Sequence, residues 1–176
     1  RENIGDSYRL GLEVDANIIL GEKFSLRPNI AISQNKNKDF FIDRDGMLQG
    51  LGDTNIAYSP GLVAGNVLSY MPCDAMNISL YSKFVGEQYL SNTDTEASKL
   101  DSYFTTDFNI TYEINMTSIV KSIVFSGLVN NIFNEKYVSN GYTYVDSWST
   151  PGNSFEVQGY YPQAGTNFLL GATVNF

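Results

Sequence analysis

Histidine is absent from the 176-residue sequence, and cysteine occurs once, as Cys73. Without histidine the chain cannot build a Ser-His-Asp or Cys-His catalytic group, an HExxH zinc site or any other histidine-ligated metal site. One cysteine allows neither an internal disulfide nor a CxxC motif, and a GxSxG nucleophile elbow is also missing. The sequence therefore predicts no catalytic residues, no cofactor and no bound metal, and Cys73 is expected to be inert.

Basic residues are scarce: 11 Lys and Arg stand against 19 Asp and Glu, for a net charge of −8. Because phosphate contacts need a cationic face, no nucleic-acid partner is predicted. The chain also lacks the run of about 18 apolar residues that a transmembrane helix needs, and its first residues lack the apolar run of a signal peptide. These tests do not detect transmembrane β-strands, whose hydrophobic signal is much weaker per segment.

Apolar and polar residues alternate along much of the chain. The even positions between Tyr8 and Leu20 are apolar and the odd ones mostly polar, and the pattern is clearest between Tyr103 and Met116. A period of two predicts strands with one apolar and one polar face. Seven strands are predicted, at residues 8–20, 24–34, 55–70, 77–89, 103–116, 123–133 and 167–176.

The connections between these strands alternate in length. Short turns are expected at 21–23, 71–75 and 117–118, and long polar loops at 35–54, 91–102 and 134–161. The strands are also long enough to cross a bilayer, which takes about 9–11 residues. Outer-membrane barrels have short periplasmic turns and long extracellular loops. We therefore expect an all-β, antiparallel, up-and-down segment of a transmembrane β-barrel.

An odd number of strands leaves two unpaired edges, which a bilayer does not tolerate. The chain is therefore expected to be part of a larger barrel. Its apolar face, including Phe108, Leu170 and Val174, should touch lipid, and Tyr8, Tyr89, Tyr103 and Tyr137 should mark the interface near the long loops. The charges of the polar face should line the lumen and pair mainly with one another; these residues are Arg9, Glu13, Asp15, Arg27, Lys83, Glu87, Asp107 and Glu113.

Several motifs make this expectation more specific. The segments YSKFVGEQYLSNT (81–93), VNNIFNEKY (129–137) and YPQAGTNF (161–168) resemble signatures of TonB-dependent outer-membrane receptors, and residues 3–11 are similar to an upstream strand of that barrel. The final strand resembles the terminal signal that the barrel-assembly machinery reads. Gly171, Val174 and Phe176 match that signal, whereas Leu169 stands where a polar residue is usual.

The resemblance implies a barrel of about 22 strands with an N-terminal plug, of which residues 1–176 are the C-terminal part. It implies an outer-membrane location in a Gram-negative bacterium and uptake of a scarce, bulky solute: an iron-siderophore, haem, cobalamin or glycan. The implied partners are outer-membrane lipid, the protein's own plug and upstream strands, the TonB complex acting through the missing N-terminal part, and the barrel-assembly machinery. Plug contacts would also pair some of the lumenal charges.

Aromatic residues in the long loops are the candidate ligand contacts. They are Phe40 and Phe41 in the first loop, and Tyr144 and Trp148 in the third, where Tyr-, Ser- and Gly-rich sequence suits recognition. The competing interpretation is packing between loops. The segment 43–46 (DRDG) is expected to be an Asp-Gly turn at a loop tip rather than a calcium loop.

Two other functions remain open at this point. Alternating strands also build a soluble or cell-surface β-sandwich binding module, in which the apolar face packs under a second sheet. An outer-membrane enzyme is the other alternative, although the missing histidine disfavours it.

Overall fold

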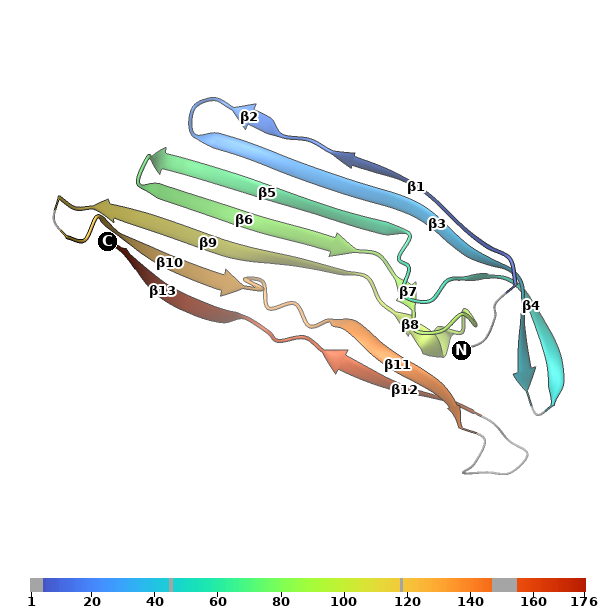
Figure 1. Cartoon of the computed structure of the whole chain (residues 1–176). Coiled ribbons are helices and arrows are strands. Elements are labelled where there is room, and N and C mark those ends of the chain that lie inside the picture. Colours follow the sequence, from blue (N-terminus) through green and yellow to red (C-terminus); the bar gives the residue numbers. More distant parts are fainter. Residues whose placement is uncertain (1–4, 45, 118, 147–154) are drawn as a thin grey trace.

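One twisted antiparallel sheet makes up most of the molecule (Figure 1). A computed structural model describes residues 5–44, 46–117, 119–146 and 155–176. The main path of the sheet runs β1-β3-β5-β6-β9-β10-β13, so neighbours in space are neighbours in sequence apart from short additions. The strands are β1 (Ser7–Asp15), β2 (Ile18–Leu20), β3 (Phe24–Arg44), β4 (Met47–Asn55), β5 (Leu62–Cys73), β6 (Met76–Val85), β7 (Gln88–Tyr89), β8 (Lys99–Leu100), β9 (Tyr103–Asn115), β10 (Ser122–Asn130), β11 (Val138–Asp146), β12 (Phe155–Pro162) and β13 (Asn167–Asn175), with a 3-10 turn, η1 (Glu96–Ser98).

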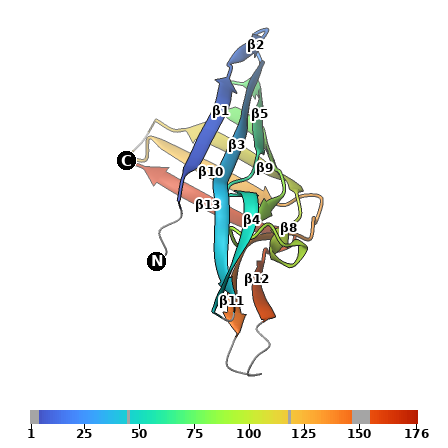
Figure 2. The same ribbon diagram turned by 90° about the vertical axis from the view of Figure 1, so that its right-hand side faces the viewer.

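The sheet is an open wall. β1 and β13 are its two edges, and the remaining pairs, β7–β8 and β11–β12, are small sheets at one end of it (Figure 2). Among the described residues no second sheet lies over the wall, so the β-sandwich alternative is wrong. The expected seven up-and-down strands are confirmed as the main path. No helix in the described ranges has the length and apolar character to span a membrane.

The strand register gathers the apolar residues on one face. Leu12 lies opposite Ile32, and Leu68 opposite Leu80, so the apolar set continues from strand to strand without a slip. The same face continues to Leu170 on the last strand, which is 81% exposed. A contiguous apolar surface of this extent is not tolerated in water and marks contact with another apolar phase or partner.

The opposite face carries the charged residues of the strands. Residues that lie opposite each other in the ladder point to the same face. The register pairs Glu13 with Ala31, Arg27 with Val67, and Lys83 with Thr105 therefore place these charges on one face of the wall. A one-residue slip anywhere would turn a strand's charged side chains to the apolar face. The strand positions among the predicted lumenal residues therefore share one face: Arg9, Glu13, Asp15, Arg27, Lys83, Asp107 and Glu113.

Two of the predicted loops are hairpins. Residues 35–54 continue β3 as far as Arg44 and return as β4, and residues 134–161 contain β11 and β12. Their sequences lack a long apolar parity, which is the signal that identified the other strands. Strands beyond the part of the wall with the continuous apolar face need no such alternation, because water can solvate both of their faces. The segment 91–102 remains largely irregular, as expected.

Several strand boundaries also differ from prediction. The third strand begins at Leu62 rather than residue 55, the fourth ends at Val85 rather than residue 89, and the sixth ends at Asn130 rather than residue 133. The first strand is interrupted between Asp15 and Ile18. Pro28 lies opposite this break and has no backbone N–H, so it accepts a bond from Ala16 but returns none.

Asn131 fixes the point where the wall ends and the β11–β12 hairpin begins. This buried residue has φ +50°, a conformation that asparagine tolerates better than most residues. Its backbone N donates to Asp107 Oδ1 (2.7 Å), and its side chain bonds both the O and the N of Glu135 (2.9 Å each). Thr166 Oγ1 donates to Asn131 O (2.7 Å). These bonds join β9, β10 and the start of β13, as expected of a residue that fixes a strand end.

Replacing Asn131 with alanine should destabilise the protein, because it removes two hydrogen bonds that a buried side chain makes to the backbone of Glu135 and places alanine at a positive φ. The expected loss is about 1–3 kcal/mol. Thermal unfolding of the complete protein in detergent measures it. Asn130→Ala is the control, since Asn130 makes only an exposed bond to Asn167 (2.8 Å) and should change the melting temperature little. Equal effects of the two substitutions would contradict the role assigned to Asn131.

Candidate ligand-binding end of the sheet

The three long connections meet at one end of the wall, opposite the tight turns (Figure 1). They are the β3–β4 hairpin, the segment 86–102 and the β11–β12 hairpin. Ligand contacts on a barrel are made where such connections gather, because the wall itself is an uninterrupted ladder. This end of the sheet is therefore the candidate site, and we refer to it as the loop end.

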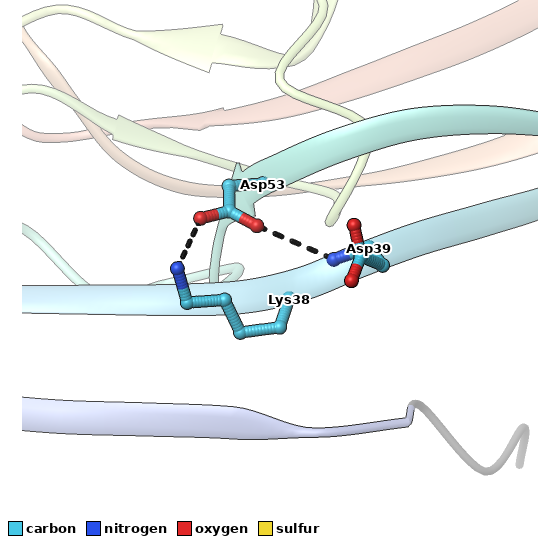
Figure 3. A network of polar contacts seen from close by, with 3 residues as sticks. All are labelled: Lys38, Asp39 and Asp53. Carbon is cyan, nitrogen blue, oxygen red and sulfur yellow. Dashed lines mark hydrogen bonds and ion pairs between the residues drawn. The ribbon is translucent and has the colours of Figure 1, made fainter.

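The β3–β4 hairpin carries an exposed polar cluster. Lys38 forms an ion pair with Asp53, whose other oxygen accepts from the backbone N of Asp39 (3.3 Å; Figure 3). The hydrogen bond from Lys38 lowers the pKa of Asp53, and the same bond raises the pKa of Lys38. At the hairpin tip Gly46 donates its N–H to Asp43 Oδ1 (2.9 Å) with φ +79°, which confirms the expected turn.

Polar contacts join this hairpin to the segment 86–102. Asp94 Oδ2 accepts from both the backbone N and the side-chain N of Asn55 (2.9 and 3.0 Å), and Asn92 Oδ1 accepts from the backbone N of Ala57 (2.8 Å). The Asp94 carboxylate and the Asn92 amide oxygen thus accept from N–H groups at the last residue of β4 and just after it. The connection from β4 to β5 is therefore held in one conformation although it has no ladder partner.

Tyr58 links three connections at once. Its backbone N donates to Tyr89 O (2.9 Å), and its hydroxyl donates to Gly141 O on β11 (3.0 Å). Its φ is +53°, an unfavourable conformation for a bulky side chain that must be compensated by such bonds. No side chain fits at position 141, because a Cβ there would lie 2.5 Å from Gly159 O. The closeness of the hairpin strands at this point thus requires glycine.

Glu156 holds the β11–β12 hairpin against the segment 86–102. Its Oε1 accepts hydrogen bonds from Ser91 (3.2 Å) and Thr143 (3.0 Å), and its Oε2 accepts from Thr95 (2.8 Å). Tyr160 adds a bond from its hydroxyl to Ala97 O (3.4 Å). One face of the hairpin is therefore committed to contacts within the protein.

A cavity of about 600 Å³ opens where the β9–β10 ladder separates into the loop end. Tyr137 stacks on Tyr103 beside it, with ring centroids 4.3 Å apart. Lys99 is held by Glu87 (3.3 Å) and Glu96 (3.6 Å), and the bond to Glu87 raises the pKa of Lys99. The walls combine both charges, amides and aromatic rings: Lys99, Asp101, Asn134, Lys136, Tyr137, Tyr160 and Gln163 are among them.

The predicted ligand contacts are placed differently from one another. Phe40 is 8% exposed and packs within the β3–β4 hairpin, whereas Phe41 is 57% exposed and covers Gly50. Tyr144 is exposed on β11, and Trp148 lies outside the described residues. Exposure keeps Phe41 and Tyr144 available to a ligand, and the burial of Phe40 favours the competing packing role.

The predicted lumenal charges do not pair with one another within the described residues. Glu87 pairs with Lys99 at the loop end, and Asp107 accepts from the backbone of Asn131. The ion pairs of the described residues include none of the other predicted lumenal charges, namely Arg9, Glu13, Asp15, Arg27, Lys83 and Glu113. The expected pairing along the wall is therefore not found.

The residues of the terminal strand keep their expected parity. Val174 lies opposite Ile123 on the apolar face, and Phe176 follows the strand. Gly171 has a local packing reason, because a Cβ there would lie 2.6 Å from Ser126 Oγ. Their role as an assembly signal stays a prediction.

Sequence analysis missed the cavity and the tyrosines that flank Tyr144. Tyr142 is exposed beside it, with the two rings stacked at 6.4 Å, and Tyr161 is exposed beside Tyr142. The alternation of Tyr142 and Tyr144 is a strand signal within the sequence predicted as a loop. The cavity has no sequence signal, because its walls come from segments more than 20 residues apart.

Two solved structures share this arrangement of strands. The siderophore receptor PiuA from Acinetobacter baumannii matches 97% of this chain with a TM-score of 0.72 and 16% sequence identity. The ferric-catecholate import receptor Fiu from K12 E. coli, in its closed form, matches 93% with a TM-score of 0.52 and 15% identity. The chain spans 22% and 27% of the lengths of these two chains.

This likeness shows the fold. The described sheet corresponds to part of the β-barrel of TonB-dependent receptors, left open because the chain covers only a section of the wall. The resemblance noted in the sequence is thereby confirmed at the level of the fold. No protein-family model matches the sequence. No curated protein matches it either.

The Lys38–Asp53 pair should contribute to hairpin stability only weakly and only at intermediate pH. The lowered pKa of Asp53 means that its contribution is present above its ordinary pKa and is lost as the pH falls through the lowered value. The raised pKa of Lys38 means that its contribution is lost only as the pH rises through the raised value. Asp53→Asn should therefore slightly increase amide exchange in β3–β4 near neutral pH.

Salt provides the control for this pair. Raising the ionic strength from about 0.01 M to about 1 M shortens the screening length from about 30 Å to about 3 Å and should remove most of the Asp53→Asn effect. Asp43→Asn removes a carboxylate that binds only a backbone N–H at the hairpin tip, so its effect should not depend on salt. A salt-independent Asp53→Asn effect would show that the ion pair is not its cause.

Glu156→Ala should loosen the β11–β12 hairpin, because three hydroxyl groups lose their acceptor at once. A local destabilisation of about 1–3 kcal/mol is expected, with a smaller effect for Glu156→Gln, which keeps one acceptor oxygen. Hydrogen exchange of the β11 and β12 amides in the complete protein measures this. If exchange there is unchanged by Glu156→Ala while the wall remains protected, the carboxylate does not hold the hairpin.

Proposed function

We propose that this chain is the C-terminal portion of the β-barrel of a TonB-dependent receptor in the outer membrane of a Gram-negative bacterium, where it takes part in uptake of a scarce, bulky solute. The observation that carries the proposal is the single-layer wall. Its apolar face is continuous and exposed, its charged face is continuous, and its long connections all lie at one end. A lipid bilayer on one side and a wet lumen on the other satisfy all three features.

The proposed mechanism begins with ligand capture at the loop end. The hairpins and the segment 86–102 are held together by the bonds of Tyr58, Asp94 and Glu156, so they offer a largely preformed surface. A preformed surface lowers the ordering cost of binding. The energised step requires the plug and the TonB complex, which would act through a part of the protein outside this chain.

The wall charges support a plug as partner. Six of them make no ion pair in the described part of the chain: Arg9, Glu13, Asp15, Arg27, Lys83 and Glu113. Charges inside a barrel are usually matched by partners that face the lumen. A plug with complementary charges would supply those partners.

The structural neighbours indicate the general class of solute. PiuA and Fiu are siderophore receptors by name, which supports an iron-siderophore for this protein, with haem, cobalamin or a glycan as the alternatives. We propose a transport role and no catalysis, since the hydroxyls of Ser91 and Thr95 that contact the Glu156 carboxylate hold the β11–β12 hairpin in place.

Arginine substitutions on the two faces test the membrane assignment. Leu170→Arg places a charge on the exposed apolar face near the centre of β13 and should cost about 2–4 kcal/mol if that face meets hydrocarbon. Thr173→Arg, three residues along the same strand and on the opposite face, should be tolerated. The amount of folded protein in the outer-membrane fraction measures both effects.

Equal tolerance of the two arginines would argue against lipid contact. So would recovery of the complete protein from the water-soluble fraction without detergent.

A further inference from the structure

The β11–β12 hairpin has two different faces. The face that carries Thr143, Glu156 and Tyr160 is bonded to the segment 86–102. The other face carries Tyr142 and Tyr144 from β11 and Tyr161 from β12, which the register places on one side of the ribbon. We call these three residues the tyrosine face.

The tyrosine face is an ordered aromatic surface. The rings of Tyr142 and Tyr144 are nearly parallel, with an interplanar angle of 11° and centroids 6.4 Å apart, and Tyr161 lies 6.0 Å from Tyr142. Tyr142 lies over Gly159 on the opposite strand, where a Cβ would come within 2.3 Å of the ring. The glycine therefore lets the ring lie close to the ribbon.

All three rings remain open to contact. They are 47–53% exposed. The hydrogen bonds on the reverse face fix the orientation of the ribbon. The rings therefore stay exposed without further bonds of their own. Tyrosine also loses little conformational entropy on binding, which makes such a surface efficient in recognition.

Charge narrows the ligand class. Residues 138–162 contain no Lys or Arg, and the acidic residues of this segment are Asp146 and Glu156. Glu156 is occupied on the reverse face. A surface without cations gives an anionic iron chelate no counter-charge, whereas phenol rings suit a neutral ligand with flat C–H faces and hydroxyl groups at its edges. Successive rings of a hexose chain have these properties and a spacing comparable to that of Tyr142 and Tyr144.

We propose that the tyrosine face binds a neutral oligosaccharide from solution by stacking its sugar rings on Tyr142 and Tyr144, with Tyr161 at the side. The inference rests on the proposed function only in placing the hairpin outside the cell. The 600 Å³ cavity is a different site, since Tyr160 on the reverse face, and not the tyrosine face, lines it.

The test is a binding measurement on the complete protein purified in detergent, with maltohexaose, cellohexaose and chitohexaose as probes. At least one should bind, and Tyr144→Ser and Tyr142→Ser should each weaken that binding about tenfold or more. Tyr144→Phe keeps the ring and should retain most of the affinity. Phe133→Ser removes an exposed ring beside the end of β10, outside the hairpin, and should leave the affinity unchanged.

Several outcomes would overturn the proposal: no binding of any of the three sugars, binding that is unchanged in both serine variants, or an equal loss in Phe133→Ser. Tyrosine-dependent binding of lipopolysaccharide vesicles or of a ferric tris-catecholate, without binding of free sugar, would also overturn it in favour of those ligands. Far-ultraviolet circular dichroism of each variant separates misfolding from lost contact. The assay uses purified protein and so tests sugar binding separately from membrane insertion. If the protein inserts in the membrane but binds none of the sugars, the oligosaccharide proposal fails and the proposed receptor function stands.

Discussion

The alternation of side chains along a hydrogen-bonded strand is the constraint on which this structure depends. The backbone groups of the inner strands of the wall are largely occupied by the ladder, so the main freedom left is which face each side chain takes. From Leu12 on β1 to Leu170 on β13 the apolar set stays on one face, and nothing in the described chain covers it. Such a wall has little interior of its own; among the described residues the buried hydrophobic side chains are Phe40, Val85, Leu90 and Leu100. Its stability therefore depends on an apolar phase beside it.

That dependence ends where the strands pass beyond the apolar zone. There β3 and β4, and later β11 and β12, continue as ribbons without a continuous apolar face. Their packing comes from individual hydrogen bonds, such as those of Asp94 to Asn55 and of Thr95 to Glu156. Such bonds contribute about 1 kcal/mol each, so several together are needed to hold one arrangement.

The wall could be predicted from the sequence, whereas the ribbons beyond it could not. Alternation identified the wall strands and their common polar face, because a sheet with one continuous apolar face requires a strict parity. It missed the β3–β4 extension and the β11–β12 hairpin, where no parity is required. It also missed the interruption of the first strand opposite Pro28, which has no backbone N–H for that ladder. At the loop end, Phe40 and Phe41 are adjacent in sequence yet one is buried and the other exposed, a difference set by which face of the hairpin meets its neighbours.

The loop end also explains why adjacent tyrosines can differ in role. Tyr160 and Tyr161 are neighbours on β12, and alternation sends the first toward Ala97 and the second beside Tyr142. One ring therefore joins the hairpin to the segment 86–102, while the next remains exposed. Because Gly141 accepts the hydroxyl of Tyr58 and Gly159 lies beneath Tyr142, the two glycines bring the strands close enough for both arrangements. A rigid ribbon anchored on one face is the simplest way to keep apolar rings outward in water, and recognition of a ligand is the benefit that offsets their exposure.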